Sequence, residues 1–352
     1  MRPRIGVLGA SGYMGGEALR VLIEHPSVDL AWATSRRPGP AERHHPNLAG
    51  AGIELIHPDD ADPCDVVLAA LPTDAVVEQA RRHLEAGARF VDLGAAFRLR
   101  SRATWERVYG QPHPDWALAE EAVYGIPELR ADEIASARLI ANPGCFSSAA
   151  ILGLAPLLAE GWIEPGCVVV DGLSGTAGVG AELWRGAHHA EIGNNLVPYN
   201  AIGHRHTFEV EQELGDLART PVRVHFTPVY VPIVRGILDL CHGMLRSDVT
   251  REEALTLYRD FYRDHPFVCI SEQAPEPNAS FDYRPYPWVS AVAGTNYCFL
   301  GLAVDRERGR IVVFSALDSI GKGGAQVGVE NANLMLGLER TAGLTRLGLH
   351  PA

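Results

Sequence analysis

The fold is decided by the stretch Arg4-Ile-Gly-Val-Leu-Gly-Ala-Ser-Gly-Tyr-Met-Gly-Gly-Glu17. A short apolar run, Arg4–Gly9, predicts a buried strand, and the helical pattern from Glu17 to His25 predicts the helix that follows it. The glycines between them form a Gly-x-x-Gly-x-x-Gly loop. Such a loop lets the backbone approach a pyrophosphate, and the helix N-terminus supplies N–H donors. We therefore expect dinucleotide contacts from Gly9, Ser11, Gly12, Tyr13, Met14 and Gly15.

Strands and helices continue to alternate after this stretch. Further strands are expected at Val28–Thr34, Asp65–Leu71, Phe90–Leu93 and Leu139–Asn142, and a helix at Thr73–Ala86. This alternation predicts an α/β fold with a Rossmann-type, doubly wound parallel sheet.

The character of the chain changes after a helix expected at Phe146–Glu160. Longer β-prone runs with few helices between them predict a second, mixed or antiparallel sheet. These runs are Val168–Gly172, Val222–Val234, Ile237–Leu245, Tyr297–Val304 and Ile311–Ala316. A last helical pattern, Gly321–Leu338, lies close to the chain end.

The bulk composition limits the possible functions. A chain of 352 residues suggests two domains, at roughly 100–200 residues per domain. A formal net charge of -12 argues against a nucleic-acid partner. No apolar stretch is long enough to span a membrane, and the N-terminus runs straight into a strand, so we expect a cytoplasmic protein. The six cysteines form no Cys-x-x-Cys pair, which predicts reduced thiols and no zinc site.

The end of the second strand bears on the choice of cofactor. NAD enzymes usually place a carboxylate there for the ribose 2′-hydroxyl. This chain has Ala33-Thr-Ser-Arg-Arg37 instead. Since Ser35 and Arg36 can bind a 2′-phosphate, which a carboxylate would repel, the sequence favours NADP(H).

The sequence Asn142-Pro-Gly-Cys145 lies at a predicted strand-to-helix corner. A cysteine in the first turn of a helix gains thiolate stabilisation from the helix dipole and the N–H groups there. Thiolates attack carbonyls and also leave readily, which suits acyl transfer. The other five cysteines lack such a corner, so Cys145 is the candidate nucleophile.

The densest source of an acid/base partner is Gly203-His-Arg-His-Thr-Phe-Glu209. In an extended segment, His204 and His206 would share a face. No supporting ligand spacing marks the pair as a metal site. Two adjacent pairs, His44-His45 and His188-His189, are expected on surface loops.

Together these motifs resemble the N-acetyl-gamma-glutamyl-phosphate reductase family of arginine biosynthesis, which is itself similar to the aspartate-semialdehyde dehydrogenases. The resemblance covers nearly the whole chain. Besides the glycine loop, the cysteine corner and the histidine segment, it includes the stretches Tyr124–Leu129, Pro232–Gly236, Gly294–Cys298 and Lys322–Gln326.

The resemblance implies a domain arrangement and a set of roles. The NADP-binding domain would comprise residues 1–143 and 319–352, and an α+β catalytic and dimerisation domain of the semialdehyde dehydrogenase type residues 144–318. Cys145 would be the nucleophile and His204 the general acid/base, with His206 in reserve. Lys322 and Gly323 would approach the nicotinamide end of the cofactor. The substrate contacts would come from Arg98, Asn142, Ser174, Gly175, His206, Glu209 and Arg235.

The implied reaction is reduction of an acyl phosphate by NADPH through a thioester on Cys145, giving a semialdehyde and inorganic phosphate, in a homodimer or homotetramer. Several stretches depart from the arginine-pathway pattern. The loop Ser174–Gly180 has no arginine at its end, and Leu71–Asp74 and Ala96–Arg98 replace a Leu-Pro-His-Gly and an Asp-Phe-Arg. These departures resemble a sister group whose aminoadipyl or glutamyl phosphate is bound to an acidic amino-group carrier protein, which leaves that substrate as an alternative.

Two other classes of protein are weighed against a reductase. A catalytically inert NADP sensor would keep the glycine loop but would have no use for the cysteine corner. An aldehyde dehydrogenase that hydrolyses its thioester would oxidise the semialdehyde without added phosphate.

Overall fold

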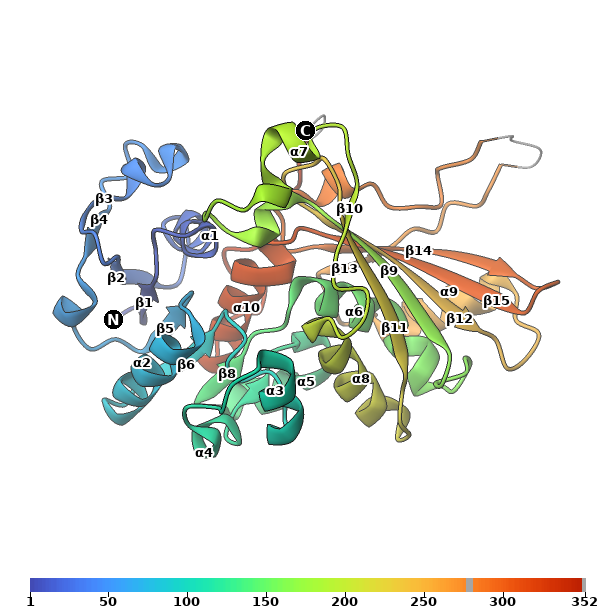
Figure 1. The fold of residues 1–352 in the computed structure, drawn as a ribbon, viewed down its shortest axis with the longest axis horizontal. Coiled ribbons are helices and arrows are strands. Elements are labelled where there is room, and N and C mark those ends of the chain that lie inside the picture. Colours follow the sequence, from blue (N-terminus) through green and yellow to red (C-terminus); the bar gives the residue numbers. More distant parts are fainter. Residues whose placement is uncertain (277–280, 350–352) are drawn as a thin grey trace. The chain divides into compact units, whose positions relative to one another are not determined.

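The computed structural model describes residues 1–276 and 281–349, and the chain divides into two compact units (Figure 1). Unit 1 consists of residues 1–143 and 324–346. Unit 2 consists of residues 144–323, together with the chain from Leu347 on.

Unit 1 is built on a sheet with the strand order β3-β4-β2-β1-β5-β6-β8-β7. All neighbouring strands in it run parallel except β3 and β4. The strands are β1 (Arg4–Leu8), β2 (Asp29–Thr34), β3 (Gly39–Pro40), β4 (Glu54–Ile56), β5 (Val66–Ala69), β6 (Arg89–Asp92), β7 (Val123–Tyr124) and β8 (Leu139–Ala141). This is the doubly wound, Rossmann-type sheet that the alternating pattern predicts.

The helices of unit 1 are α1 (Tyr13–Leu22), α2 (Thr73–Glu85), α3 (Arg102–Tyr109), α4 (Trp116–Ala119), α5 (Pro127–Ser136) and α10 (Gln326–Met335). Of these, α1, α2, α5 and α10 contact strands of the sheet. Helix α10 packs against α1 and α5 and also touches β5 and β6. The last helix of the chain therefore completes the first unit.

Unit 2 is built on a mixed sheet with the order β10-β11-β9-β12-β15-β14-β13. Its strands are β9 (Val168–Ser174), β10 (Val197–Pro198), β11 (Val224–Tyr230), β12 (Ile237–Met244), β13 (Val268–Ile270), β14 (Cys298–Asp305) and β15 (Arg310–Leu317). The pairs β9–β11 and β13–β14 are parallel and the remaining pairs antiparallel. The expectation of a mixed sheet is confirmed.

The two faces of this sheet differ. Helices α6 (Cys145–Ala159), α8 (Arg205–Ala218) and α9 (Arg251–Phe261) pack against it, and a short α7 (His189–Ile192) lies in the long connection before β10 (Figure 1). On β9 and β12 burial alternates, so that Val170 and Cys241 are buried while Leu173 and Leu238 are half-exposed. Because alternate residues of a strand share a face, one face carries the core and the other stays partly open.

The conformation of the histidine segment, which the sequence left open, is the start of a helix: Gly203 has a φ of +76°, His204 caps the helix, and α8 follows. One segment differs from the sequence expectation. The pattern from Gly321 is not one helix, because Gly324 (φ -163°, ψ -107°) separates the turn Gly321–Ala325 from α10.

Candidate active site

The glycine loop in unit 1 has the close approaches that the motif predicts. Gly9 has a φ of +75°, and a Cβ there would lie 2.3 Å from the Ala70 carbonyl oxygen. A Cβ on Gly15 would lie 2.5 Å from the Gly9 oxygen, and Gly12 is the N-cap of α1. Only glycine fits at the first and third positions, so the backbone N–H groups at the start of α1 stay open to a phosphate.

A pocket of about 470 Å³ in unit 1 is lined by Ser11, Ser35, Arg36, Arg37 and His44. It combines two hydroxyls with two guanidinium groups, and no carboxylate lines it. Hydroxyl and guanidinium donors are suited to a phosphate monoester, so these residues fit the 2′-phosphate of NADP.

The expected surface position of His45 is wrong. His45 is buried, its Nε2 lies 2.7 Å from the carbonyl oxygen of Ala10, and its ring packs against Gly16. His45 therefore contacts both the glycine loop, at Ala10, and the first turn of α1, at Gly16. His188 and His189 are exposed, as expected.

Arg98 and Asn142 are engaged within unit 1. The Arg98 Nε donates to the Asn142 carbonyl oxygen at 2.8 Å. The Asn142 amide donates to the Gly324 oxygen at 3.0 Å and accepts from Asn331 at 3.1 Å. Nearby, burial raises the pKa of Asp92 to about 6, although three backbone N–H groups and Arg98 oppose the shift. These contacts hold the Arg98 and Asn142 side chains in place at the end of β8.

Cys145 is the first residue of α6 and is partly exposed. Its N-cap, Gly144, donates its N–H to Glu209 Oε2 at 3.0 Å. A Cβ on Gly323 would lie 2.7 Å from the Cys145 Cβ, so only a glycine at 323 allows this close approach. The sulfur therefore stands where helix N–H groups favour its anionic form.

His204 and His206 meet at the start of α8, with ring centroids 4.8 Å apart. His204 Nδ1 accepts the His206 N–H at 3.2 Å, which places the proton of a neutral ring on Nε2. Burial, and to a lesser extent Arg205, lowers the pKa of His204 to about 4. His204 is therefore neutral at physiological pH.

His206 has a different environment. Its Nε2 lies 3.9 Å from Glu209 Oε1, and both side chains are buried. A Cβ on Gly144 would lie 2.4 Å from this Nε2, so the ring packs against the residue before Cys145. Both rings also lie edge-on to Phe146, at 6.0 Å for His204 and 5.9 Å for His206. The structure thus brings Cys145, His204, His206 and Glu209 together within unit 2.

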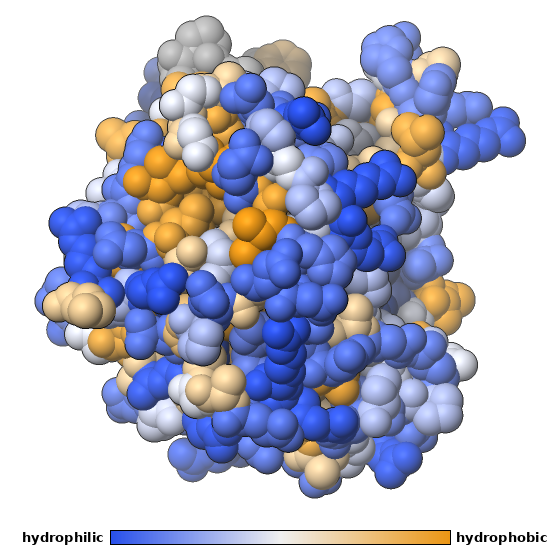
Figure 2. Space-filling view, turned by 90° about the vertical axis from the view of Figure 1, so that its left-hand side faces the viewer, coloured by the Kyte–Doolittle hydropathy of each residue, from blue (hydrophilic) through white to orange (hydrophobic). Residues whose placement is uncertain are grey.

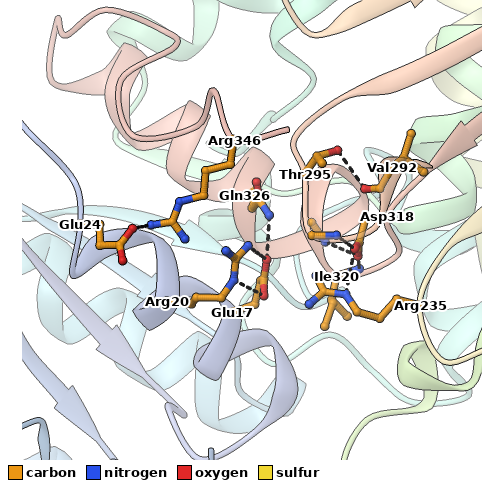
Figure 3. A network of polar contacts seen from close by, with 12 residues as sticks. Glu17, Arg20, Glu24, Arg235, Val292, Thr295, Asp318, Ile320, Gln326 and Arg346 are labelled. Atoms are coloured by element: carbon orange, nitrogen blue, oxygen red, sulfur yellow. Dashed lines mark hydrogen bonds and ion pairs between the residues drawn. The ribbon is translucent and has the colours of Figure 1, made fainter. Parts of the chain in front are cut away.

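Arg235 is held by an ion pair that the sequence did not indicate. Its Nε donates to Asp318 Oδ2 at 2.8 Å, and Asp318 is fully buried (Figure 3). Asp318 Oδ1 also accepts the N–H groups of Ile320 and Gly321, each at 2.9 Å. No pattern around Asp318 signals this pairing, because its partner lies 83 residues away in the chain.

Ser174 and Gly175 end β9 and pack on the same loop. The Ser174 hydroxyl donates to the Gly175 oxygen at 2.9 Å, and the Gly175 N–H donates to the Gly236 oxygen at 2.9 Å. A Cβ on Gly175 would lie 2.6 Å from the Val234 oxygen. This stretch therefore fixes the backbone on either side of Arg235.

Lys322 is 1% exposed, and its Nζ lies 5.4 Å from the centre of the Phe267 ring. A cation over an aromatic face is a packing contact within unit 2. In unit 1, Glu17 accepts from both Arg20 and Gln326, which ties α1 to α10 (Figure 3).

The remaining features concern ligands of other kinds. Within residues 1–276 and 281–349, no group of three or more His, Cys, Asp or Glu could hold a metal ion. No helix in that part of the chain is long and apolar enough to cross a membrane. All six cysteines are free thiols, and Cys167 is exposed.

Known proteins resemble this chain over its whole length. Residues 4–137 match the family described as semialdehyde dehydrogenase, NAD binding domain, and residues 145–319 match semialdehyde dehydrogenase, dimerisation domain. The N-acetyl-gamma-glutamyl-phosphate reductase of Methanopyrus kandleri is 42% identical over 355 residues, 99% of each chain. That of Desulforudis audaxviator is 40% identical over 356 residues, again 99% of each.

Solved structures share the fold at lower identity. Aspartate semialdehyde dehydrogenase II of Vibrio cholerae, complexed with ASA, superposes with a TM-score of 0.70 at 17% identity, covering 96% of this chain and 98% of its own. The Candida albicans aspartate semialdehyde dehydrogenase, solved with NADP, has a TM-score of 0.60 at 15% identity and covers 96% and 99%. With a glycine loop for NAD(P) in unit 1 and a cysteine at a helix start in unit 2, the chain belongs to the N-acetyl-gamma-glutamyl-phosphate reductase family of semialdehyde dehydrogenases.

Proposed function

We propose that this enzyme reduces N-acetyl-γ-glutamyl phosphate to N-acetylglutamate semialdehyde and inorganic phosphate in arginine biosynthesis. The observation that carries the proposal is the position of Cys145 at the start of α6, with His204, His206 and Glu209 around it. The relatives that bear this activity in their names align over 99% of the chain.

The proposed cofactor is NADP(H), held by unit 1. Gly9, Gly12 and Gly15 would receive the pyrophosphate, and Ser35 and Arg36 the 2′-phosphate in the pocket that they line. When bound, the nicotinamide supplies the hydride that reduces the acyl carbon. Gly323, which borders Cys145, stays a proposed contact through its backbone, whereas the packing of Lys322 on Phe267 supports a structural role.

Cys145 acts in two ways in the proposed mechanism. Its thiolate attacks the acyl phosphate carbon, a C–S bond forms, and the C–O bond to phosphate breaks with release of inorganic phosphate. After reduction, the thiohemiacetal oxygen loses its proton and the C–S bond breaks, which returns the thiolate. The helix N-terminus stabilises the sulfur anion in both steps.

We assign the role of general acid/base to His206 instead of His204. His204 is neutral, and its Nδ1 is occupied by a backbone N–H. His206 lies beside the Glu209 carboxylate, which stabilises a positive charge on the ring. Of the proposed substrate contacts, Arg235 remains the candidate for a carboxylate or phosphate, and Asp318 fixes its orientation.

The test is NADP⁺ reduction in the presence of inorganic phosphate and N-acetylglutamate semialdehyde. We expect turnover with this substrate, and a loss of several orders of magnitude in kcat in Cys145→Ala with cofactor binding retained. Cys167→Ala, which removes an exposed cysteine of the same unit, is the matched control and should keep full activity. Near-normal activity of Cys145→Ala would contradict the mechanism, and turnover that needs no phosphate would indicate a hydrolytic dehydrogenase.

The carrier-protein alternative concerns the substrate alone. Exposed arginines such as Arg36 and Arg37 offer a positive charge to an acidic partner, although the whole chain carries -12. The two substrate hypotheses are distinguished by kcat/KM. It is measured for free N-acetyl-γ-glutamyl phosphate and for the carrier-bound aminoadipyl or glutamyl phosphate. We expect the free substrate to be preferred.

The proposed assembly is a cytoplasmic homo-oligomer, at least a dimer, formed by unit 2. The matched family of residues 145–319 is described as a dimerisation domain. The half-exposed face of the sheet, with Leu173, Leu238 and Phe314, is the proposed contact surface. The side of the molecule shown in Figure 2 is mainly hydrophilic, with apolar residues gathered in its upper left part.

A further inference from the structure

One buried carboxylate lies where three loops of unit 2 meet. Asp318 directly follows β15, and Arg235 lies two residues before β12. These strands pair antiparallel with Ile237 opposite Leu317, so the end of β15 and the start of β12 lie at the same edge of the sheet. The register of the sheet therefore brings Asp318 beside Arg235, although 83 residues separate them in the chain.

The Asp318 carboxylate accepts hydrogen bonds at both of its oxygens (Figure 3). Oδ2 accepts from the Arg235 Nε at 2.8 Å and from the Gly294 N–H. Oδ1 accepts from the N–H groups of Ile320 and Gly321, each at 2.9 Å. The side chain is fully buried, and each of these partners is a donor. An ionised carboxylate fits such a position because it accepts at both oxygens and donates at neither.

The turn that follows Asp318 leads to the nucleophile. The Gly323 N–H donates to the Asp318 carbonyl oxygen at 2.9 Å, and the Lys322 N–H donates to the Thr295 oxygen at 3.3 Å. A Cβ on Gly323 would lie 2.7 Å from the Cys145 Cβ. The backbone of this turn therefore lies directly against Cys145, and Asp318 holds the turn through its side chain and through its carbonyl oxygen.

The contact with Asp318 also fixes the direction of the Arg235 side chain. A guanidinium group is a rigid plane, so a hydrogen bond at Nε fixes where its terminal nitrogens point. The Arg235 side chain is 25% exposed, whereas that of Asp318 is fully buried. A ligand can therefore reach the guanidinium while the carboxylate that orients it stays inside the protein.

We propose that Asp318 is a positioning residue for substrate binding and for the nucleophile at once. Through Oδ2 it orients Arg235 toward an anionic group of the substrate, and through Oδ1 it shapes the turn that lies against Cys145. Asparagine cannot replace it, because in either orientation the NH₂ group of the amide would face N–H donors. The inference rests on the proposed roles of Arg235 and Cys145.

The experiment measures KM and kcat in Asp318→Asn, in Arg235→Gln and in the double variant. NADP⁺ is kept saturating, and KM is determined separately for N-acetylglutamate semialdehyde and for inorganic phosphate. A variant that is only partly folded has a lower apparent kcat but an unchanged KM, because the folded molecules that remain bind substrate normally. KM is therefore the quantity that a purely structural role of Asp318 would not change.

We expect Asp318→Asn to raise one of the two KM values roughly 10–100-fold, the usual effect of losing a hydrogen bond to a charged group. The KM for the semialdehyde rises if Arg235 binds its carboxylate, and the KM for phosphate rises if Arg235 binds phosphate. Arg235→Gln should raise the same KM by at least as much. Adding Asp318→Asn to Arg235→Gln should change that KM by no more than about twofold, because the effect of Asp318 on binding acts through Arg235.

The effect on the turn is read from kcat. Asp318→Asn should lower kcat by the same factor whether residue 235 is arginine or glutamine, because the turn against Cys145 is disturbed in both cases. Asp239→Asn is the matched control. Asp239 is also fully buried in unit 2, and neither of its carboxylate oxygens has a hydrogen-bond partner among the described residues. This variant should keep both KM values of the unmodified enzyme.

Arg235→Lys tests the same idea if Asp318→Asn does not fold. Lysine keeps the positive charge but has no Nε–H in a rigid plane for Asp318 to orient, so the KM in question should rise at least about tenfold. Unchanged KM values in Asp318→Asn or in Arg235→Lys overturn the inference, and so does a further large rise in the double variant. Turnover by the unmodified enzyme still supports the proposed function in these cases. If the unmodified enzyme does not turn over this semialdehyde, the proposed function itself fails, and the inference fails with it.

Discussion

At the scale of single residues, the two histidines at the start of α8 have different surroundings. His204 caps α8 through Nδ1, has no carboxylate partner in the contacts described above, and has a pKa lowered to about 4 by burial. His206 lies beside Glu209 and against Gly144. A ring used as a helix cap is poorly suited to exchange a proton with substrate, whereas a ring paired with a carboxylate is well suited.

This difference predicts opposite results for two substitutions. His204→Ser keeps a helix-capping oxygen and should lower kcat by less than about tenfold. His206→Gln should lower kcat by roughly 10²–10⁴-fold, the usual contribution of general acid–base catalysis. Steady-state kinetics between pH 5 and 9 provide the measurement. Since His204 titrates near pH 4, the acid limb of the kcat profile should stay in place in His204→Ser.

Glu209→Gln is the control for the carboxylate. It should shift the acid limb of the profile without removing the ring of His206. If His204→Ser instead loses as much activity as we expect His206→Gln to lose, His204 is the general acid/base, as the family resemblance implies.

At the scale of elements, β12 carries an unusual residue in its middle. Asp239 is fully buried, and neither of its carboxylate oxygens has a hydrogen-bond partner in the described part of the chain. Its cross-strand neighbours are Gly172 of β9 and Ser315 of β15. Burial raises the pKa of Asp239 well above its ordinary value, because the buried site disfavours the charged carboxylate.

The sign of the pH dependence follows from this shift. Above about pH 4 the unfolded chain releases the proton, whereas the folded protein retains it. The contribution of Asp239 to the free energy of unfolding is therefore fully present below the pKa of the unfolded state. It decreases as the pH rises, by at most about 1.4 kcal/mol per pH unit, until the pH reaches the pKa of the folded state. Asp92, with a pKa of about 6, acts in the same direction between about pH 4 and pH 6.

We expect Asp239→Asn to remove this decrease in folding stability at rising pH. The melting temperature of the unmodified protein, relative to the variant, should fall as the pH rises from 4 to 8, in scans by calorimetry or circular dichroism. Asp264→Asn, at an exposed position, is the control and should follow the unmodified protein at every pH. Parallel curves for Asp239→Asn and the unmodified protein would show that Asp239 is solvated or paired in solution.

At the scale of the whole molecule, the outer face of the second sheet is partly exposed. Leu173 and Leu238 lie on it, and Phe314 on the same face packs on Tyr286 with ring centroids 4.5 Å apart. His242 Nε2 lies 3.8 Å from Asp171 Oδ2 there. Apolar surface of this kind on a sheet is stabilised when a second sheet packs on it.

We therefore expect the enzyme to be at least a dimer, and Leu238→Lys to dissociate it. A lysine in the centre of an interface of standard size, about 1,600 Å², would be buried without a partner. Sedimentation velocity at micromolar concentration gives the mass. Ile23→Lys, at an apolar position of unit 1 with 39% exposure, should leave the mass unchanged. An unmodified enzyme that sediments as a monomer would contradict this assembly.

The sequence alone determined what depends on local conformation and periodicity. The glycine loop, the strand-to-helix corner at Cys145 and the longer strands of both sheets follow from residues adjacent in the chain, because glycine conformation and hydrophobic periodicity are local properties. Membership of the reductase family also follows from motifs in their order along the chain.

Only the tertiary structure decided what depends on contacts between distant residues. The ion pair of Arg235 with Asp318, the stacking of Tyr199 on Tyr230 and the burial of His45 join parts of the chain that no local pattern relates. The different surroundings of His204 and His206 belong to this group too, because the position of a proton on an imidazole is set by the atoms around the ring after folding.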